Sequence, residues 1–172
     1  MRFSSKPNSG PFRALFPPGR KITLFKTELG SFGALICFES ANPFLARTAV
    51  SRGAEMLVVL TNNAWFGKTA AAAQHLQMLR MRAAENGVYA LQAANTGITA
   101  IISPEGEILE ETALFKKDVI KGQVALAGRK TFYNRLGYLF PYFALFFGLS
   151  QFLILLGKAL ARNKTRFLSP PA

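Results

Sequence analysis

The protein has 172 residues, of which 50% are hydrophobic and 12% aromatic, so one packed domain is expected rather than a disordered chain. Its formal net charge of +12 makes an acidic partner, either nucleic acid or an anionic membrane surface, a candidate. The single cysteine excludes an internal disulfide, and with one histidine there is no ligand set for a transition metal, so we expect neither a metal site nor a cofactor.

The chain begins with a predicted loop and two strands. Residues 1–20 are rich in Pro, Gly, Ser and basic residues, and no signal peptide is visible in them. Residues 22–25 and 31–38 predict strands around a turn at residues 28–30. The second strand is almost wholly apolar, so we expect it to be buried on both faces.

A helix and a further strand follow. Residues 42–52 predict a helix, with Asn42 as its N-cap and Pro43 at the first helical position. Residues 55–60 predict another buried strand. A strand, a helix and a strand with short connections predict a crossover and a partly parallel sheet, and hence an α/β fold.

The central part continues this alternation. A polar and aromatic loop over residues 61–67 leads to a predicted helix over residues 69–85. Its stripe facing the core is predicted to comprise Leu76, Met78, Leu79 and Met81. Further strands are predicted over residues 88–94, 98–103, 108–110 and 118–126.

The carboxy-terminal part is different in kind. Residues 137–157 carry no charge and match the roughly 20 residues needed to cross a bilayer, which predicts a transmembrane helix. The alternative is a buried helix of the globular core. Tyr138 and Tyr142 suit a membrane interface, and basic residues on both sides give only a weak preference for a cytoplasmic carboxy terminus. Anionic lipid therefore explains the net charge better than nucleic acid, for which no motif is present.

Cys37 is the first candidate for chemistry. It lies at the carboxyl end of a predicted buried strand, where open α/β sheets place reactive groups. Its alternative role is that of a small buried apolar residue. Glu39 projects to the same side as Cys37 if the strand continues, and there it can orient a nucleophile or a neighbouring base. A salt bridge or a cap at the strand end is the alternative for Glu39.

A second group of candidates follows the next strand. Asn62, Trp65 and Phe66 belong to a loop that lies near Cys37 if the two strands are neighbours, where it can line an acyl pocket or steady an oxyanion. A turn anchored by a buried Trp65 is the competing interpretation. His75 is the only histidine, but its position in the middle of a helix favours a packed or capping role over that of a base for the thiol.

Several segments, in this order and spacing, resemble the nitrilase-like domain of the apolipoprotein N-acyltransferases, in the carbon–nitrogen hydrolase superfamily. They are Leu35–Glu39 (LICFE), Leu60–Gly67 (LTNNAWFG), Gln74–Met78 (QHLQM) with Arg80–Gly87 (RMRAAENG), and Ala94–Thr99 (ANTGIT). The resemblance covers roughly residues 18–157. It identifies residues 21–128 with the carboxy-terminal part of that domain, residues 129–158 with a linker and transmembrane helix, and residues 159–172 with a basic tail.

The resemblance implies a partial α-β-β-α sandwich followed by one carboxy-terminal transmembrane helix, on the outer, periplasmic face of the bacterial inner membrane. It implies transfer of a fatty acyl chain from a phospholipid to the amino-terminal cysteine amine of a diacylated apolipoprotein, through a thioester. Cys37 matches the family's nucleophile, Glu39 matches a supporting glutamate beside it, and Trp65 falls in the loop that borders the site.

The chain also departs from the family pattern. The glutamate that accepts the thiol proton and the lysine that supports the oxyanion lie upstream of the cysteine in the family, and the Lys-x-x-Leu-x-Pro-Phe-Gly-Glu segment is absent here. We therefore expect a carboxy-terminal portion that is inactive alone. Phe38 and Asn63 stand where Tyr and Asp are common, which is expected to alter hydrogen bonds near the thiol. An amidase-type carbon–nitrogen hydrolase and a non-catalytic membrane-tethered module are the alternatives.

Overall fold

The computed structural model describes residues 21–126, 131–137 and 139–167, so the loop predicted over residues 1–20 lies outside the described residues. Within the described part, six strands form one sheet in chain order: β1 (Leu24–Thr27), β2 (Gly30–Ile36), β3 (Met56–Asn62), β4 (Tyr89–Asn95), β5 (Ala100–Ile102) and β6 (Ile108–Glu111). The helices are α1 (Pro43–Ser51), α2 (Ala71–Asn86), α3 (Phe132–Leu136) and α4 (Leu139–Phe167), with short 3-10 helices η1 (Cys37–Ala41) and η2 (Ala64–Phe66).

The centre of the sheet is parallel, as the sequence predicts. Strands β2, β3 and β4 run in the same direction, while β1, β5 and β6 are antiparallel to their neighbours. Ile36 lies opposite Leu60, and Asn62 lies opposite Asn95. The carboxyl ends of the three parallel strands therefore meet at one edge of the sheet, where α/β proteins place their sites.

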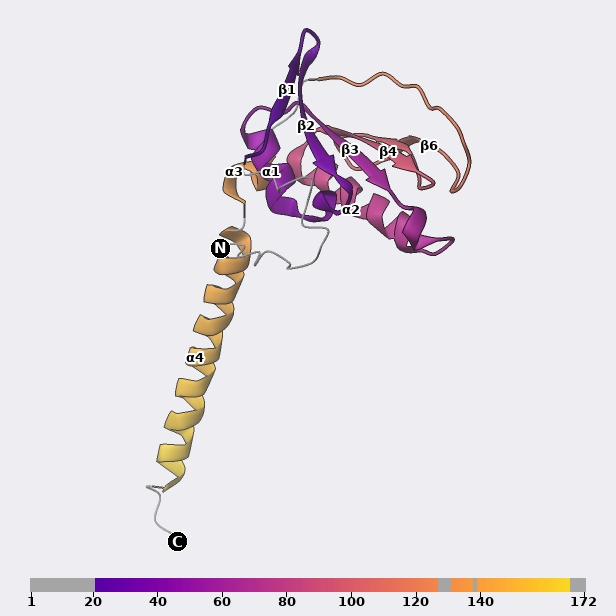
Figure 1. Ribbon diagram of the computed structural model, residues 1–172. Coiled ribbons are helices and arrows are strands. Elements are labelled where there is room, and N and C mark those ends of the chain that lie inside the picture. Colours follow the sequence, from indigo (N-terminus) through magenta and orange to yellow (C-terminus); the bar gives the residue numbers. More distant parts are fainter. Residues whose placement is uncertain (1–20, 127–130, 138, 168–172) are drawn as a thin grey trace, which may run out of the picture.

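Helices α1 and α2 cover one face of the sheet (Figure 1). Side chains along β3 point alternately to the two faces of the sheet, and those of Leu57 and Val59 are completely buried against the helices. The side chain of Ala49 in α1 reaches the backbone of Gly33, where an added Cβ would lie 2.8 Å from it. Glycine at this position thus lets α1 pack directly on β2, and the core forms between this helix layer and the sheet.

The opposite face of the sheet carries apolar side chains that remain accessible. Ile36 is 67% exposed and Leu60, next to buried Val59, is 55% exposed. The connection after β6 arches back toward β1, with Leu126 beside Gly30 (Figure 1). The described residues therefore provide one helix layer and one sheet layer, which is half of the expected four-layer sandwich.

The prediction of a strand over residues 118–126 is wrong, because this segment has no regular structure. The carboxylate of Asp118 accepts a hydrogen bond from the N–H of Val119 at 2.9 Å and pairs with the Lys116 ammonium at 3.1 Å. Such a local bond occupies a backbone donor that a strand would offer to its neighbour.

The core stripe predicted for the second helix is only partly right. Leu76 and Leu79 are buried in α2, but Met81 is 57% exposed. Two positions along a helix turn the side chain about 200° around the axis, so Met81 lies on the face opposite Leu79. The buried positions are taken instead by His75 and Arg82, polar residues that the apolar pattern does not reveal.

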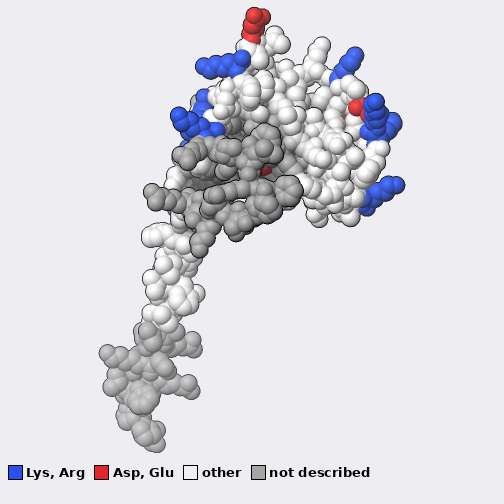
Figure 2. Space-filling view, in the orientation of Figure 1, with Lys and Arg blue, Asp and Glu red and all other residues white. Residues whose placement is uncertain are grey.

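Helix α4 projects from the domain as a separate stem (Figure 1). Its stretch Leu139–Lys158 has 20 residues with a mean hydropathy of 2.0, and none of its most apolar window is buried. The alternative of a buried core helix is therefore wrong. Figure 2 shows the described upper part of this stem without charged side chains, while Lys and Arg side chains lie around the domain. Helix α4 is long and apolar enough to cross a membrane.

Candidate active site

Cys37 occupies a sharp turn at the end of β2. The strand ends at Ile36, two residues earlier than the sequence predicts, and η1 begins at Cys37. The backbone of Cys37 has a φ of 51°, in the left-handed region that costs a non-glycine residue roughly 1–2 kcal/mol. Such strain persists only where the surroundings fix the conformation, and it gathers at functional sites. The Cys37 side chain is half-buried and free.

Two buried side chains hold this turn through the Cys37 carbonyl oxygen. That oxygen accepts hydrogen bonds from Ser40 Oγ at 3.1 Å and from His75 Nε2 at 3.0 Å, and Ser40 Oγ lies 2.8 Å from His75 Nε2. Because a carbonyl only accepts, Nε2 of His75 must carry the proton. The other ring nitrogen, Nδ1, is buried with no partner in the described part of the chain. His75 thus holds the backbone of Cys37 rather than its thiol.

Ser40 is a site residue that sequence reasoning missed. Its side chain is completely buried, and its hydroxyl reaches back three residues to the Cys37 carbonyl. A Ser or Thr three residues after a turn is a known signal for such a local bond, but it is too common to single out Ser40 in advance. The ring of Phe38 completes the surroundings by stacking on His75, with ring centroids 6.1 Å apart.

Glu39 would project to the same side as Cys37 only if the strand continued, and β2 stops at Ile36. Its carboxylate instead turns back and accepts a hydrogen bond from the N–H of Ile36 at 2.8 Å. Strand β1 pairs with β2 no further than Gly33, so this amide faces an edge without a strand partner. Glu39 therefore caps the strand end, as one of its alternatives predicted.

The loop after β3 lies at the same edge of the sheet as Cys37. Asn62 Oδ1 accepts hydrogen bonds from the N–H of Ala64 at 3.1 Å and from Asn95 Nδ2 at 3.5 Å. Trp65 is 77% exposed, which overturns the alternative of a turn anchored by a buried Trp. Phe66 is half-buried beside it. The loop thus presents a large aromatic surface at the carboxyl edge.

Asn63 fixes this loop to the next strand. Its N–H donates to the Asn95 carbonyl at 3.1 Å, and its Oδ1 accepts from Thr61 Oγ1 at 2.8 Å. An added Cβ on Gly97 would lie 2.5 Å from Asn63 Nδ2, so a side chain at Gly97 would collide with it. Asn63 is buried, and its Nδ2 has no partner among the described residues. Asn63 therefore fixes the conformation of the loop, while the side chain of Trp65 is exposed to solvent.

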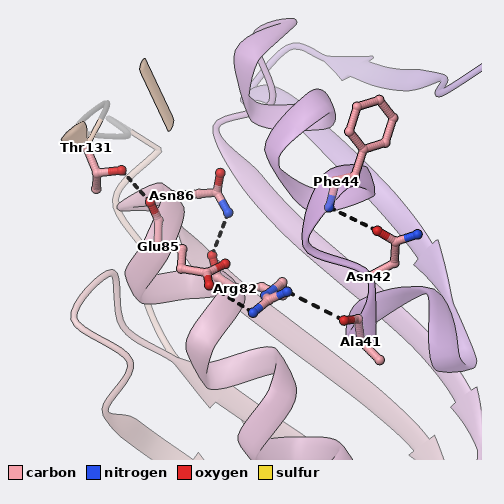
Figure 3. A network of polar contacts seen from close by, with 7 residues as sticks. All are labelled: Ala41, Asn42, Phe44, Arg82, Glu85, Asn86 and Thr131. Carbon is pink, nitrogen blue, oxygen red and sulfur yellow. Dashed lines mark hydrogen bonds and ion pairs between the residues drawn. The ribbon is translucent and has the colours of Figure 1, made fainter. Parts of the chain in front are cut away.

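A buried arginine of α2 connects this helix to the end of η1 (Figure 3). Arg82 is 5% exposed, and its guanidinium contacts Glu85 Oε1 at 2.9 Å and the carbonyl of Ala41 at 3.5 Å. Burial raises the pKa of Glu85 above its ordinary value of 4.5, against the opposing effect of the Arg82 charge. The helix that carries His75 is thus linked to both ends of η1.

A cleft of about 450 Å³ opens next to the site. Its walls are mainly apolar, with Ile36, Phe44 and Leu45 among them, and Lys21, Arg52 and Glu39 add charge. Among the described residues, no three His, Cys, Asp or Glu side chains gather where they could hold a metal ion. The site therefore combines a constrained thiol, an aromatic loop and an apolar cleft.

The amino-acid sequence matches the carbon–nitrogen hydrolase family over residues 4–133. Among curated relatives, it is 45% identical over 127 residues to the apolipoprotein N-acyltransferase of Geobacter metallireducens, which covers 74% of this chain and 24% of the relative. It is 37% identical over 130 residues to the protein of the same name from Thermotoga maritima, covering 74% and 25%. The chain thus spans about a quarter of the length of these relatives.

Solved structures give the same family. An amidase from Nesterenkonia sp. AN1 is 26% identical with a TM-score of 0.51, over 61% of this chain and 44% of that one. The nitrilase-superfamily protein Nit3 of Saccharomyces cerevisiae is 25% identical with a TM-score of 0.52, over 59% and 40%.

Proposed function

Since the chain belongs to the carbon–nitrogen hydrolase family, we propose that it is the nucleophile-bearing, carboxy-terminal portion of an apolipoprotein N-acyltransferase. In this proposal Cys37 receives a fatty acyl chain from a phospholipid and passes it to the amino-terminal cysteine amine of a diacylated apolipoprotein. The relatives' name supports the reaction class, and the sheet edge supports the position of the thiol.

The reaction has two half-steps. The Cys37 sulfur attacks the ester carbonyl of the phospholipid, the ester C–O bond breaks, and the thiol proton passes through a base to the leaving alcohol of the lysophospholipid. The apolipoprotein amine then attacks the thioester, the C–S bond breaks, and the proton lost by the amine restores the thiol. As the resemblance implies, the proton-accepting base and the oxyanion-supporting lysine are supplied in this proposal by a part of the complete enzyme outside the match.

The described residues have supporting roles in this scheme. Ser40 and His75 hold the Cys37 backbone in its turn, and Glu39 keeps the end of β2 in place. Asn62, Trp65 and Phe66 border the thioester and contact substrate. The apolar cleft beside Ile36, with Lys21 and Arg52 on it, suits an acyl chain and an anionic headgroup.

One observation carries the proposal: the same chain holds a constrained cysteine and an accessible apolar helix long enough to cross a bilayer. Phospholipid esters are found in the bilayer, so an enzyme that uses them gains from an anchor beside its thiol. We place the domain on the periplasmic face of the bacterial inner membrane, with α4 as the anchor. A reagent for thiols that does not cross membranes should then modify Cys37, the only cysteine, in intact spheroplasts.

Mass spectrometry tests the acyl-enzyme. We use a chimaera in which the 127 matching residues of this chain replace their counterparts in the Geobacter metallireducens relative, because the remaining length of that relative is then present. Incubation with phospholipid vesicles should add a fatty acyl mass to Cys37, removable by hydroxylamine. The variant Cys37→Ser gives no such adduct, and this chain alone should give none either. An unmodified Cys37 in an otherwise folded chimaera would disprove the proposal.

An amidase remains the second candidate, since a similar amidase carries the acetamide moiety of fluoroacetamide covalently at its active-site cysteine. Water would then replace the amine as acceptor. A soluble amide substrate has no need of a bilayer anchor, which favours acyl transfer. Comparing release of ammonia from simple amides with acylation of a lipopeptide by the chimaera separates the two. A chimaera that is inactive in both assays would favour a non-catalytic membrane-tethered module.

A further inference from the structure

Helix α3, the short element just before α4, is hydrogen-bonded to the site domain through Thr131, Asn134 and Arg135. At its beginning, Thr131 accepts a hydrogen bond from the N–H of Asn134 at 3.0 Å and donates its own hydroxyl proton to the Glu85 carbonyl at the end of α2 (Figure 3). Thr131 thus caps two helices at once, satisfying a donor of α3 and a terminal acceptor of α2.

The middle of α3 is fixed by a buried amide pair. Asn134 is 4% exposed, and its Nδ2 donates to Asn86 Oδ1 at 2.7 Å and to the Arg47 carbonyl at 3.4 Å. Asn86 is completely buried, and its own Nδ2 donates to the Arg82 carbonyl at 2.8 Å. Buried amides that bond in series restrict relative movement, because leaving one unpaired is costly.

The end of α3 is held by a cation. The Arg47 guanidinium of α1 donates to the carbonyl oxygens of Asn134 at 3.1 Å and Arg135 at 3.5 Å. A positive charge at a helix carboxyl end is favourable. Gly137 has a φ of 61°, in the left-handed region that favours glycine, and an added Cβ there would lie 2.7 Å from this guanidinium and displace it.

We propose that Thr131, Asn134, Asn86 and Arg47 form a clamp that fixes the catalytic edge at one position relative to α4, and hence to the bilayer. The clamp joins the two helices that flank the nucleophile: α1 follows η1 directly, and α2 carries His75, which holds the Cys37 carbonyl. Helix α3 ends at Leu136 and α4 begins at Leu139, so two residues of sequence separate the clamped helix from α4. The functional meaning of the clamp rests on the proposed acyl transfer. Asn134 and Arg47 are its positioning residues.

A distance measurement in nanodiscs tests the clamp without any assay of activity. Cys37→Ser removes the only native cysteine, and spin labels are placed at Ala73→Cys, exposed on α2, and Leu145→Cys, exposed on α4. Pulsed electron resonance should give one narrow distance distribution. Asn134→Ala and Arg47→Ala should each broaden it, and an unchanged narrow distribution in both would overturn the proposal.

Matched variants separate the clamp from general stability. Ser103→Ala removes a buried hydroxyl that bonds Glu105 and Glu107 in a turn away from α3, and it should leave the distance distribution unchanged. Broadening by Ser103→Ala as well would mean that any loss of stability has this effect, against the clamp. If circular dichroism shows that Asn134→Ala is unfolded, the milder Thr131→Val decides by the same criterion.

The chimaera adds a functional reading. Clamp variants should lose acylation from bilayer phospholipid by about 10²-fold, the cost of misplacing reacting groups by roughly 1 Å, while a small soluble reagent still alkylates Cys37 at the reference rate. Equal acylation by Asn134→Ala and the reference chimaera would reject a positioning role. If the reference chimaera itself forms no thioester, the proposed function fails, whereas the spin-label distances still decide whether the clamp exists.

Discussion

At the scale of single residues, His75 and Ser40 fix the shape of the turn at Cys37 through its carbonyl oxygen. His75 touches the Cys37 carbonyl and a buried hydroxyl, both through Nε2. A histidine so placed can influence the reactivity of Cys37 by holding its backbone.

This assignment predicts the behaviour of His75 variants. His75→Gln, which retains an N–H donor, should leave the pH dependence of Cys37 alkylation by iodoacetamide unchanged. His75→Ala should lower the free energy of unfolding by roughly 1–3 kcal/mol, because buried oxygens lose a donor. Alkylation rates across pH and denaturation in detergent micelles measure the two effects. A shifted alkylation midpoint in His75→Gln would instead identify His75 as a base.

The raised pKa of Glu85 predicts that the free energy of unfolding depends on pH. Its pKa in the folded protein is raised by burial above the ordinary value of 4.5, so the folded state binds more protons than the unfolded state between the two values. The free energy of unfolding must therefore fall as pH rises from 4.5 through the folded pKa. Glu85→Gln should flatten this part of the profile, and Glu105→Gln, on an exposed turn, should not. Chemical denaturation at a series of pH values gives the comparison; identical profiles for Glu85→Gln and the parent would contradict it.

At the scale of elements, the sequence reveals regular structure well and its interruptions poorly. Asn42 accepts from the N–H of Phe44 at 3.0 Å as the predicted cap of α1, and Gly87 ends α2 in the left-handed conformation. These boundaries follow from local chemistry. The turn at Cys37 does not, because nothing local signals a positive φ in a residue that is not glycine. The bond from His75 to Cys37 spans 38 residues and exists only through packing of α2 on the sheet.

The hydrogen bond from the Ile36 N–H to the Glu39 carboxylate predicts slow amide exchange at the end of β2. Removing the Glu39 carboxylate with Glu39→Ala should deprive the Ile36 N–H of its acceptor and speed its hydrogen exchange about fivefold, for a bond worth about 1 kcal/mol. Glu39→Gln keeps an oxygen acceptor and should show a smaller effect. Exchange of the Leu57 amide, in the middle of β3, serves as an internal reference. Equal exchange at Ile36 in all three proteins would show that Glu39 does not cap the strand.

At the scale of the whole molecule, helices cover one face of the sheet, while the opposite face remains exposed. Val59 and Leu60 are neighbours on β3, yet Val59 is completely buried against the helices while Leu60 is 55% exposed. Exposed apolar surfaces of this kind favour association, and they suit a sheet layer supplied by the remaining length of the relatives.

Adjacent substitutions test this difference. Leu60→Lys should leave this chain folded and raise its soluble yield, whereas Val59→Lys should prevent folding, because it buries a charge without a partner. In the chimaera, where the second layer is present, Leu60→Lys should instead become destabilising. Circular dichroism and the yield of folded protein report each case. Leu60→Lys tolerated equally in both contexts would mean that no layer covers this face.

The close connection between α3 and α4 has a consequence for kinetics. In the proposed acyl transfer, a site that the clamp holds at one height above the bilayer meets only the lipids directly beneath it, so donor molecules must reach it by lateral diffusion. Once the enzyme is embedded, its rate should depend on the mole fraction of donor lipid in the membrane and not on the amount of membrane in the assay. Diluting the donor with inert ether lipid would slow the reaction, whereas adding more vesicles of the same composition would not change the turnover of enzyme already inserted.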